Sequence, residues 1–188
     1  IYGDVLKLDD TAFTTLDLDG GDLPNGEVID TVSLVSENGV DVSTTKGVGL
    51  NEGNISIAET SADNKTLTVS NGFNQKNYKI DYETGNLTIK QRTITLKAKD
   101  QEKIYGNVLD LGSTKFTVED LDGGDLPNGE LIDTVSLVSA DGVDASTDAD
   151  VGTYSDNISI TATSADKQTL TGSNGFDQEN YDISYETG

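Results

Sequence analysis

The sequence predicts an all-β protein built from two tandem repeats, and three observations lead to this expectation. Residues 1–85 and 104–188 correspond at a constant offset of 103 residues, without insertion or deletion, and 58 of the 85 paired positions are identical. Apolar and hydroxyl-bearing residues alternate with the period of two that is typical of strands. Turn-forming pairs such as Asn-Gly separate these runs. We therefore expect two β-sheet domains, elongated and either β-grasp-like or sandwich-like.

Strand-like runs follow one another along each repeat. In the first repeat they lie at residues 5–8, 13–16, 28–35, 54–58, 66–69 and 78–82. The last run has the clearest alternation, because Tyr78, Ile80 and Tyr82 share one face while charged residues occupy the other. The only helical alternative is one short turn per repeat, across residues 27–31 in the first.

A connector, residues 86–103, occurs once, between the two repeats. Leu87 and Ile89 form one alternating run, and Ile94, Leu96 and Ala98 form a second. These runs predict the closing strand of one repeat and the opening strand of the next. We therefore place the first domain at residues 1–92, lacking its opening strand, and the second at residues 93–188, lacking its closing strand.

The composition argues against an enzyme. The chain contains no Cys, His, Met or Trp, so disulfides, thiolate nucleophiles and zinc–thiolate sites are excluded, and the commonest general base at neutral pH is absent. Carboxylate pairs act in glycosidases, but close pairs are expected by chance in a chain with 34 acidic residues. We therefore expect no catalytic residues.

Charge is unevenly distributed along the chain. The first repeat has 15 acidic and 5 basic residues, the second has 17 and 2, and the connector has 2 and 5, which together give the net charge of −22. Such acidity opposes binding to nucleic acid or anionic lipid. No apolar run approaches the ~20 residues that span a bilayer. We expect neither nucleic-acid binding nor membrane insertion.

An Asp- and Gly-rich loop is the best candidate for a metal site. Its carboxylates are Asp17, Asp19 and Asp22 in the first repeat and Asp120, Asp122 and Asp125 in the second. Calcium takes six to eight oxygen ligands, which closely spaced aspartates on a Gly-rich turn can supply. The alternative is an ordinary turn with solvated carboxylates. No cofactor is required, and calcium is the metal ion that this loop could bind.

Short motifs in a fixed order carry a resemblance to a known family. They are Lys103-Ile104-Tyr105-Gly106, then Val151-Gly152-Thr153-Tyr154, then residues 180–188. In this order they resemble the YGX-type MBG repeats of large bacterial surface adhesins, and residues 77–89 followed by 91–96 are similar to the junction between units of that family. The resemblance implies a mostly β module, strung in tandem on an exported cell-surface or biofilm-matrix protein, with no known catalytic residues.

The expected function is structural. We expect a stalk or spacer of a surface adhesin, an extracellular fibre or a biofilm matrix. Its partners would be neighbouring repeats or identical chains that pair through open strand edges. The alternative is an adhesive module whose repeats bind a surface glycan or a protein with multivalent gain.

Overall fold

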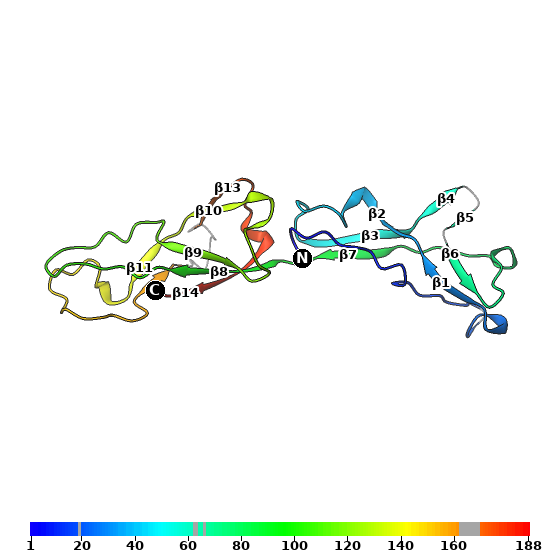
Figure 1. Ribbon diagram of the computed structural model, residues 1–188, viewed down its shortest axis with the longest axis horizontal. Coiled ribbons are helices and arrows are strands. Elements are labelled where there is room, and N and C mark those ends of the chain that lie inside the picture. The colour runs from blue at the N-terminus through cyan, green and yellow to red at the C-terminus, as the bar shows by residue number, and fades with distance from the viewer. Residues whose placement is uncertain (19, 62–63, 66, 162–169) are drawn as a thin grey trace. The chain divides into compact units, whose positions relative to one another are not determined.

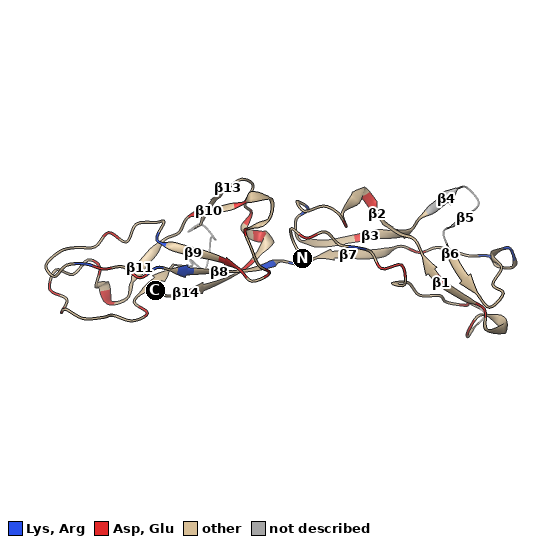
Figure 2. Cartoon of the chain, in the orientation of Figure 1, with Lys and Arg blue, Asp and Glu red and all other residues tan. Residues whose placement is uncertain are grey.

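The fold is all-β, which confirms the fold class predicted from the sequence. The computed structural model describes residues 1–18, 20–61, 64–65, 67–161 and 170–188. These residues form fourteen strands and six 3-10 helices of three residues each (Figure 1). None of the helices in these ranges is long and apolar enough to cross a membrane. Acidic residues are spread over both repeats (Figure 2).

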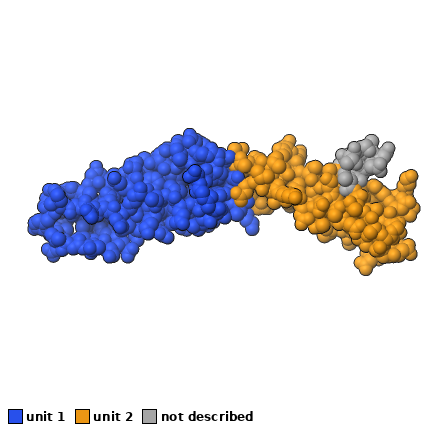
Figure 3. Space-filling view, viewed as in Figure 1, with its two compact units in different colours: residues 1–3, 90–188 blue, residues 4–89 orange. Residues whose placement is uncertain are grey.

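The chain divides into two compact units (Figure 3). Unit 2 comprises residues 4–89, and unit 1 comprises residues 90–188 together with Ile1–Gly3. The division therefore falls between Ile89 and Lys90, whereas the sequence analysis placed it between Arg92 and Thr93. It also assigns the first three residues of the first repeat to the unit formed mainly by the second repeat.

Unit 2 contains two- and three-stranded antiparallel sheets. Its strands are β1 (Val28–Val32), β2 (Leu34–Ser36), β3 (Gly49–Ile57), β4 (Glu59–Ser61), β5 (Asn64–Lys65), β6 (Leu67–Ser70) and β7 (Gly85–Ile89). The sheets have the orders β2-β3-β7, β1-β6 and β4-β5. The 3-10 helices are η1 (Pro24–Gly26), η2 (Glu37–Gly39) and η3 (Gln75–Asn77).

Unit 1 is organised around one central strand, β8. Its strands are β8 (Arg92–Ala98), β9 (Phe116–Asp120), β10 (Leu131–Thr134), β11 (Leu137–Ser139), β12 (Ile158–Ile160), β13 (Thr171–Ser173) and β14 (Tyr181–Glu186). β8 pairs in parallel with β14 and antiparallel with β9, and two further sheets pair β10 with β13 and β11 with β12. The 3-10 helices are η4 (Pro127–Gly129), η5 (Ala140–Gly142) and η6 (Gln178–Asn180).

The core of unit 1 is centred on β8. Ile94 and Leu96 are 0% exposed, and Ala98 is 1% exposed. The surrounding buried side chains come from segments far apart in the sequence: Leu111, Phe116, Ile132, Val135, Ile158, Ile160 and Tyr181. Because β8 lies between β14 and β9, its inward side chains make the centre of this core.

Several predicted strands form as expected. The run at 28–35 gives β1 and β2, the run at 54–58 gives the end of β3, and residues 67–69 lie in β6, while residue 66 lies outside the described ranges. The connector runs give β7 and β8. The helical alternative across residues 27–31 is wrong, because β1 begins at Val28 and the helical turn is η1, at Pro24–Gly26.

The strands predicted at residues 5–8, 13–16 and 78–82 are wrong for the first repeat. All these residues are described, and none of them belongs to a strand in unit 2. The corresponding segments of the second repeat include β9 and β14. The physical reason is β8, which supplies the hydrogen-bond ladder to both of those strands. The predicted alternation still holds, since Tyr78, Ile80 and Tyr82 are half-buried and the residues between them are exposed.

The two repeats also differ in the length of the strands β3 and β12, which occupy corresponding positions. In the first repeat β3 has nine residues and pairs with β7, whereas its counterpart β12 has three. Residues 152–157, which the structure describes, lie outside any strand. A backbone pair joins Ile158 and Gly188, with N–O distances of 3.3 and 2.9 Å.

Leu96→Ala should strongly destabilise unit 1. Removing a fully buried Leu side chain and leaving a cavity costs about 2–5 kcal/mol of unfolding free energy. Lys97→Ala is the neighbouring control, since Lys97 makes only an exposed ion pair with Glu186 at 3.6 Å, of a kind worth at most about 1 kcal/mol. Denaturant unfolding of both variants checks this expectation. Equal losses in the two variants would contradict the central role of β8.

Candidate functional site at the junction of the repeats

A buried carboxylate in unit 1 binds two tyrosine hydroxyls. Glu130, 3% exposed, follows η4 directly, and its backbone N–H donates to the Pro127 carbonyl. Tyr181, at the start of β14, donates its hydroxyl to Glu130 Oε2 at 2.7 Å, and Tyr2 donates to Oε1. The two tyrosine rings meet edge to face, with centroids 5.6 Å apart. A residue from the first repeat thus completes a buried cluster of the second.

A buried ion pair lies beside this cluster. Arg92 Nε, at the start of β8, donates to Asp120 Oδ2 at 2.7 Å, and both side chains are less than one-tenth exposed. The guanidinium also donates from Nη1 to the Tyr2 carbonyl oxygen at 3.3 Å. The Tyr2 backbone N–H donates in turn to the Lys90 carbonyl oxygen at 2.9 Å. Ion pairs of this kind are costly to break once buried.

Gly3 brings the backbone close to the helical turn η4. Its φ of +86° is unfavourable for other residues, and a Cβ at this position would lie 2.4 Å from Pro127 Cγ. Glycine is therefore required both for the turn after Tyr2 and for the contact with Pro127. The pair Tyr2-Gly3 fits this site as a unit.

Burial and hydrogen bonding raise the pKa values of these tyrosines. Burial, followed by the hydrogen bond to Glu130, raises the pKa of Tyr2 to about 12. The same two causes raise the pKa of Tyr181 further above its ordinary value. Both hydroxyls are therefore protonated donors at neutral pH, as their bonds to the carboxylate require.

We call five residues of unit 1 the filled socket and their counterparts at the offset of 103 residues the open socket. The filled socket consists of Asp120, Leu126, Pro127, Glu130 and Tyr181. The open socket, in unit 2, consists of Asp17, Leu23, Pro24, Glu27 and Tyr78. All five residue types are identical.

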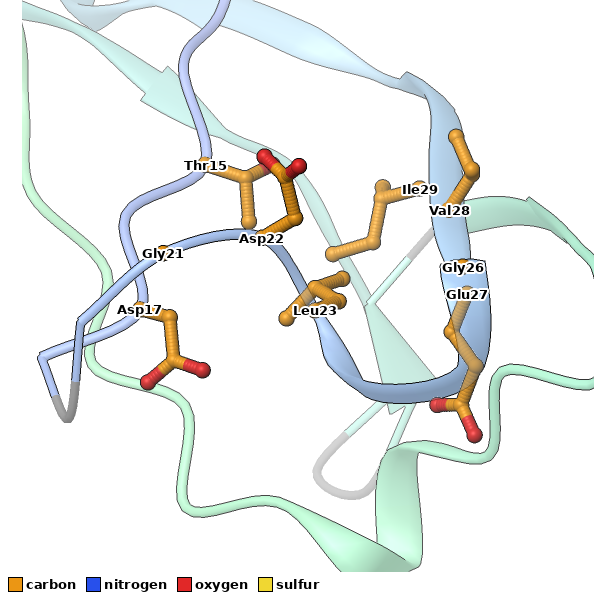
Figure 4. A pocket seen from close by; sticks show the side chains of 9 residues that line it. All are labelled: Thr15, Asp17, Gly21, Asp22, Leu23, Gly26, Glu27, Val28 and Ile29. Atoms are coloured by element: carbon orange, nitrogen blue, oxygen red, sulfur yellow. The ribbon is translucent and has the colours of Figure 1, made fainter.

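The open socket contains a pocket. The pocket has a volume of about 300 Å³, and Asp17, Leu23 and Glu27 are among the residues that line it (Figure 4). Tyr78 donates its hydroxyl to Glu27 Oε2 at 2.5 Å and stacks on Phe73 with ring centroids 5.0 Å apart. In unit 1, Tyr181 likewise donates to Glu130 and stacks on Phe176. The hydrogen bond to Glu27 is the main cause that raises the pKa of Tyr78 to about 12. The inner half of the cluster is thus already formed.

The second copy of the tripeptide is exposed. Tyr105 is 62% exposed and Ile104 is 74% exposed, whereas Tyr2 is 3% exposed. Gly106 has a φ of +87°, nearly equal to that of Gly3, and no described atom lies within 4 Å of the Cβ position there. The tripeptide therefore bends in the same way whether it is buried or exposed.

The structure assigns the candidate calcium residues different surroundings. Asp120 is buried in the ion pair with Arg92, while Asp122 and Asp125 are exposed. Asp17 and Asp22 line the pocket of unit 2, and Asp19 lies outside the described residues. Within the described ranges no three acidic side chains form a group that could hold a metal ion. In the second repeat the loop is thus a turn whose first aspartate binds an arginine.

Sequence reasoning missed the junction residues Tyr2, Arg92 and Glu130. A signal was present, because Ile-Tyr-Gly occurs in both repeats and residues 17–27 are identical to 120–130. The sequence did not indicate that the tripeptide of one repeat contacts the loop of the other, because Tyr2 and Glu130 are 128 positions apart. The chemistry of the site is recognition, in which two carboxylates hold two hydroxyls and one guanidinium.

The chain matches no family model, no curated protein and no solved structure.

Gly3→Ala should destabilise unit 1 more than Gly106→Ala destabilises the chain. Both substitutions introduce a Cβ at nearly the same positive φ, a strain of about 1–2 kcal/mol. Only Gly3→Ala also adds the overlap with Pro127, and overpacking of this kind costs typically about 1–3 kcal/mol more. Thermal unfolding of the two variants measures the difference. Equal destabilisation would contradict the packing of Gly3 against η4.

Stability should fall as the pH rises from about 10 to about 12. Below the ordinary tyrosine pKa of 10.0 the folded and unfolded states are both protonated, and the stabilisation by Tyr2 is complete. Above it the unfolded chain loses the proton first, so stability is lost until the folded pKa of about 12 is passed. Tyr2→Phe should reduce this loss relative to the unchanged protein, because lysine titration is common to both. Midpoints of unfolding against pH check it, and identical profiles would refute it.

Proposed function

We propose that this chain is a structural segment of a tandem β-repeat protein of a bacterial surface, serving as adhesin stalk, extracellular fibre or biofilm matrix. The observation that carries the proposal is that unit 1 is formed by parts of both repeats and of the connector. Its core strand β8 comes from the connector, and its buried Tyr2 comes from the first repeat. A unit assembled from parts of consecutive repeats makes neighbours in an array depend on each other for folding.

Chain connectivity supports a role in holding repeats together. The chain passes between the units twice, at Gly3–Asp4 and at Ile89–Lys90. Near both crossings the backbone is fixed in unit 1, by the bond from the Tyr2 N–H to the Lys90 carbonyl and by the bond from Arg92 to the Tyr2 carbonyl. The first repeat is therefore tied to unit 1 at both of its ends.

Electrostatics supports the same role. Charged side chains of the connector contact the acidic second repeat: Arg92 binds Asp120, Lys97 lies 3.6 Å from Glu186, and Lys103 Nζ donates to the Ser146 carbonyl at 2.6 Å. The remaining acidity gives a strongly negative surface, which opposes collapse and non-specific association. The connector thus neutralises charge locally where the repeats are joined.

The proposed location and partners follow from the resemblance to surface-adhesin repeats. The partners are other copies of the repeat, joined at junctions of this kind. No catalytic step is proposed, because the buried carboxylates of the junction are bound to tyrosine and arginine side chains.

Tyr2→Ala should destabilise unit 1, and Tyr105→Ala should not. Tyr2 loses a buried ring and a hydrogen bond to a carboxylate, at a cost of about 3–5 kcal/mol. The identical side chain of Tyr105 is exposed, and its removal should change stability by no more than about 0.5 kcal/mol. Calorimetry of both variants measures the contrast.

Two results would contradict the proposal. Equal shifts in the two variants would remove the evidence for shared folding. Reproducible binding of one glycan class by the unchanged chain on a glycan array would favour an adhesive module over a spacer.

A further inference from the structure

We infer that unit 1 contains a mechanical clamp, the parallel strand pair β8–β14, which resists unfolding when the chain is pulled along its length. This inference rests on the proposed function, because a stalk, fibre or matrix protein carries tension along its chain. The resistance of a folded unit depends on where tension enters it, where tension leaves it, and which hydrogen bonds lie between these points.

Tension enters unit 1 at the start of β8. The chain passes from unit 2 to unit 1 between Ile89 and Lys90, and β8 begins at Arg92. The second crossing, at Gly3–Asp4, leads to the same place, because the Tyr2 backbone is bonded to Lys90 and Arg92. A pull from the side of unit 2 therefore acts on the first residues of β8, in the direction opposite to the course of this strand.

Tension leaves unit 1 at the end of β14. This strand ends at Glu186, and Gly188 lies beside the end of β8, since a Cβ at Gly188 would lie 2.6 Å from the Ala98 carbonyl oxygen. In the first repeat the counterpart of Gly188 is Gly85, from which the chain runs through β7 into the connector and unit 1. The sequence Tyr-Glu-Thr-Gly thus precedes the passage from one unit to the next.

β8 and β14 are therefore pulled in opposite directions along their length. The two strands are parallel, with six consecutive pairs from Tyr181 opposite Arg92 to Glu186 opposite Lys97. A force on the start of one strand and the end of the other acts along the strands rather than along the hydrogen bonds between them. The hydrogen bonds of the ladder then bear the load together, whereas a force that opens the pair from one end breaks them one after another.

Contacts on both sides of the pair oppose sliding. On its other side β8 is held by β9 through five antiparallel pairs. On the side of β14, Ile183 and Tyr185 lie opposite the fully buried Ile94 and Leu96. Sliding of one strand past the other would therefore move closely packed apolar side chains out of register.

The two ends of the ladder are also fixed. At the entry, Gln91 donates its side-chain amide to the Tyr181 carbonyl oxygen at 3.2 Å. At the exit, Ile158 of β12 and Gly188 exchange two backbone hydrogen bonds, at 3.3 and 2.9 Å. The strand pair is thus held both where tension enters and where it leaves.

Unit 2 contains no such clamp within the part of the chain that the structure describes. Its strand pairs there are all antiparallel. Residues 78–83, the counterpart of β14, lie outside any strand. The connector that transmits tension between the units therefore also supplies the strand that resists it in unit 1.

Single-molecule pulling on the full chain in two geometries tests the clamp. The chain has no Cys, so handles attach only at introduced thiols, and both versions carry a Cys added after Gly188. One version also carries Lys90→Cys, which loads β8 and β14 in shear. The other carries Lys99→Cys, beside Gly188, which peels the two strands apart. Both lysines are exposed, and unit 2 lies outside the loaded segment in each version.

The shear geometry should unfold unit 1 at a force at least about twofold higher than the peeling geometry at the same loading rate, because six paired positions share the load. Release of about 300 Å of chain, at ~3.5 Å per residue, identifies complete unfolding of unit 1 in both geometries. Equal forces in the two geometries, or a higher force in peeling, would overturn the inference.

The clamp and the proposed function can fail separately. The contrast between Tyr2→Ala and Tyr105→Ala is measured by calorimetry without force, and it tests whether the repeats share a fold. A preserved contrast with equal forces would overturn the clamp alone. A higher force in shear without that contrast would support the clamp and overturn the proposal of shared folding.

Discussion

Unit 1 depends on one strand, β8, which is encoded by the segment that occurs once. β8 gives a ladder to β14 on one side and to β9 on the other, places Ile94 and Leu96 at the centre of the core, and begins with the arginine that binds Asp120. Backbone pairing, apolar burial and charge pairing are thus supplied by seven consecutive residues. An edge strand pairs its backbone on one side only, whereas a central strand such as β8 pairs it on both sides.

The two repeats show how similar sequences form different structures in different tertiary surroundings. The segment from Tyr78 and the segment from Tyr181 share the alternation that predicts a strand, yet only the second forms one in the described structure. Sequence pattern predicted which side chains face inward, because the period of two is local. It could not predict which copy forms the ladder, because the partner strand lies about 90 residues away in the sequence. Both segments have the residue pattern of a strand, but only the segment that lies beside β8 forms one.

The aspartate loop shows a second limit of sequence reasoning. A spacing of Asp-x-Asp with adjacent glycines fits a calcium loop and a tight turn equally well, because both need carboxylates and positive φ. In the second repeat the structure shows the features of the turn: Asp120 lies inside and binds Arg92, while Asp122 donates its backbone N–H to Asp120 Oδ1 at 3.0 Å. The carboxylate is therefore both a turn cap and a partner for the connector. In unit 1 its partner is the connector, and the partners of the nearby Glu130 are Tyr2 and Tyr181.

The chemistry of the junction also sets how copies can combine. The tripeptide at residues 104–106 and the open socket around Glu27 are different surfaces, so a contact between them is heterologous rather than two-fold symmetric. A two-fold contact stops at a dimer, whereas a heterologous one uses one surface and leaves the other available. Each copy of the chain carries both surfaces, so a contact made through one of them leaves the other available. A contact of this heterologous kind can therefore be repeated in the same sense from one copy to the next.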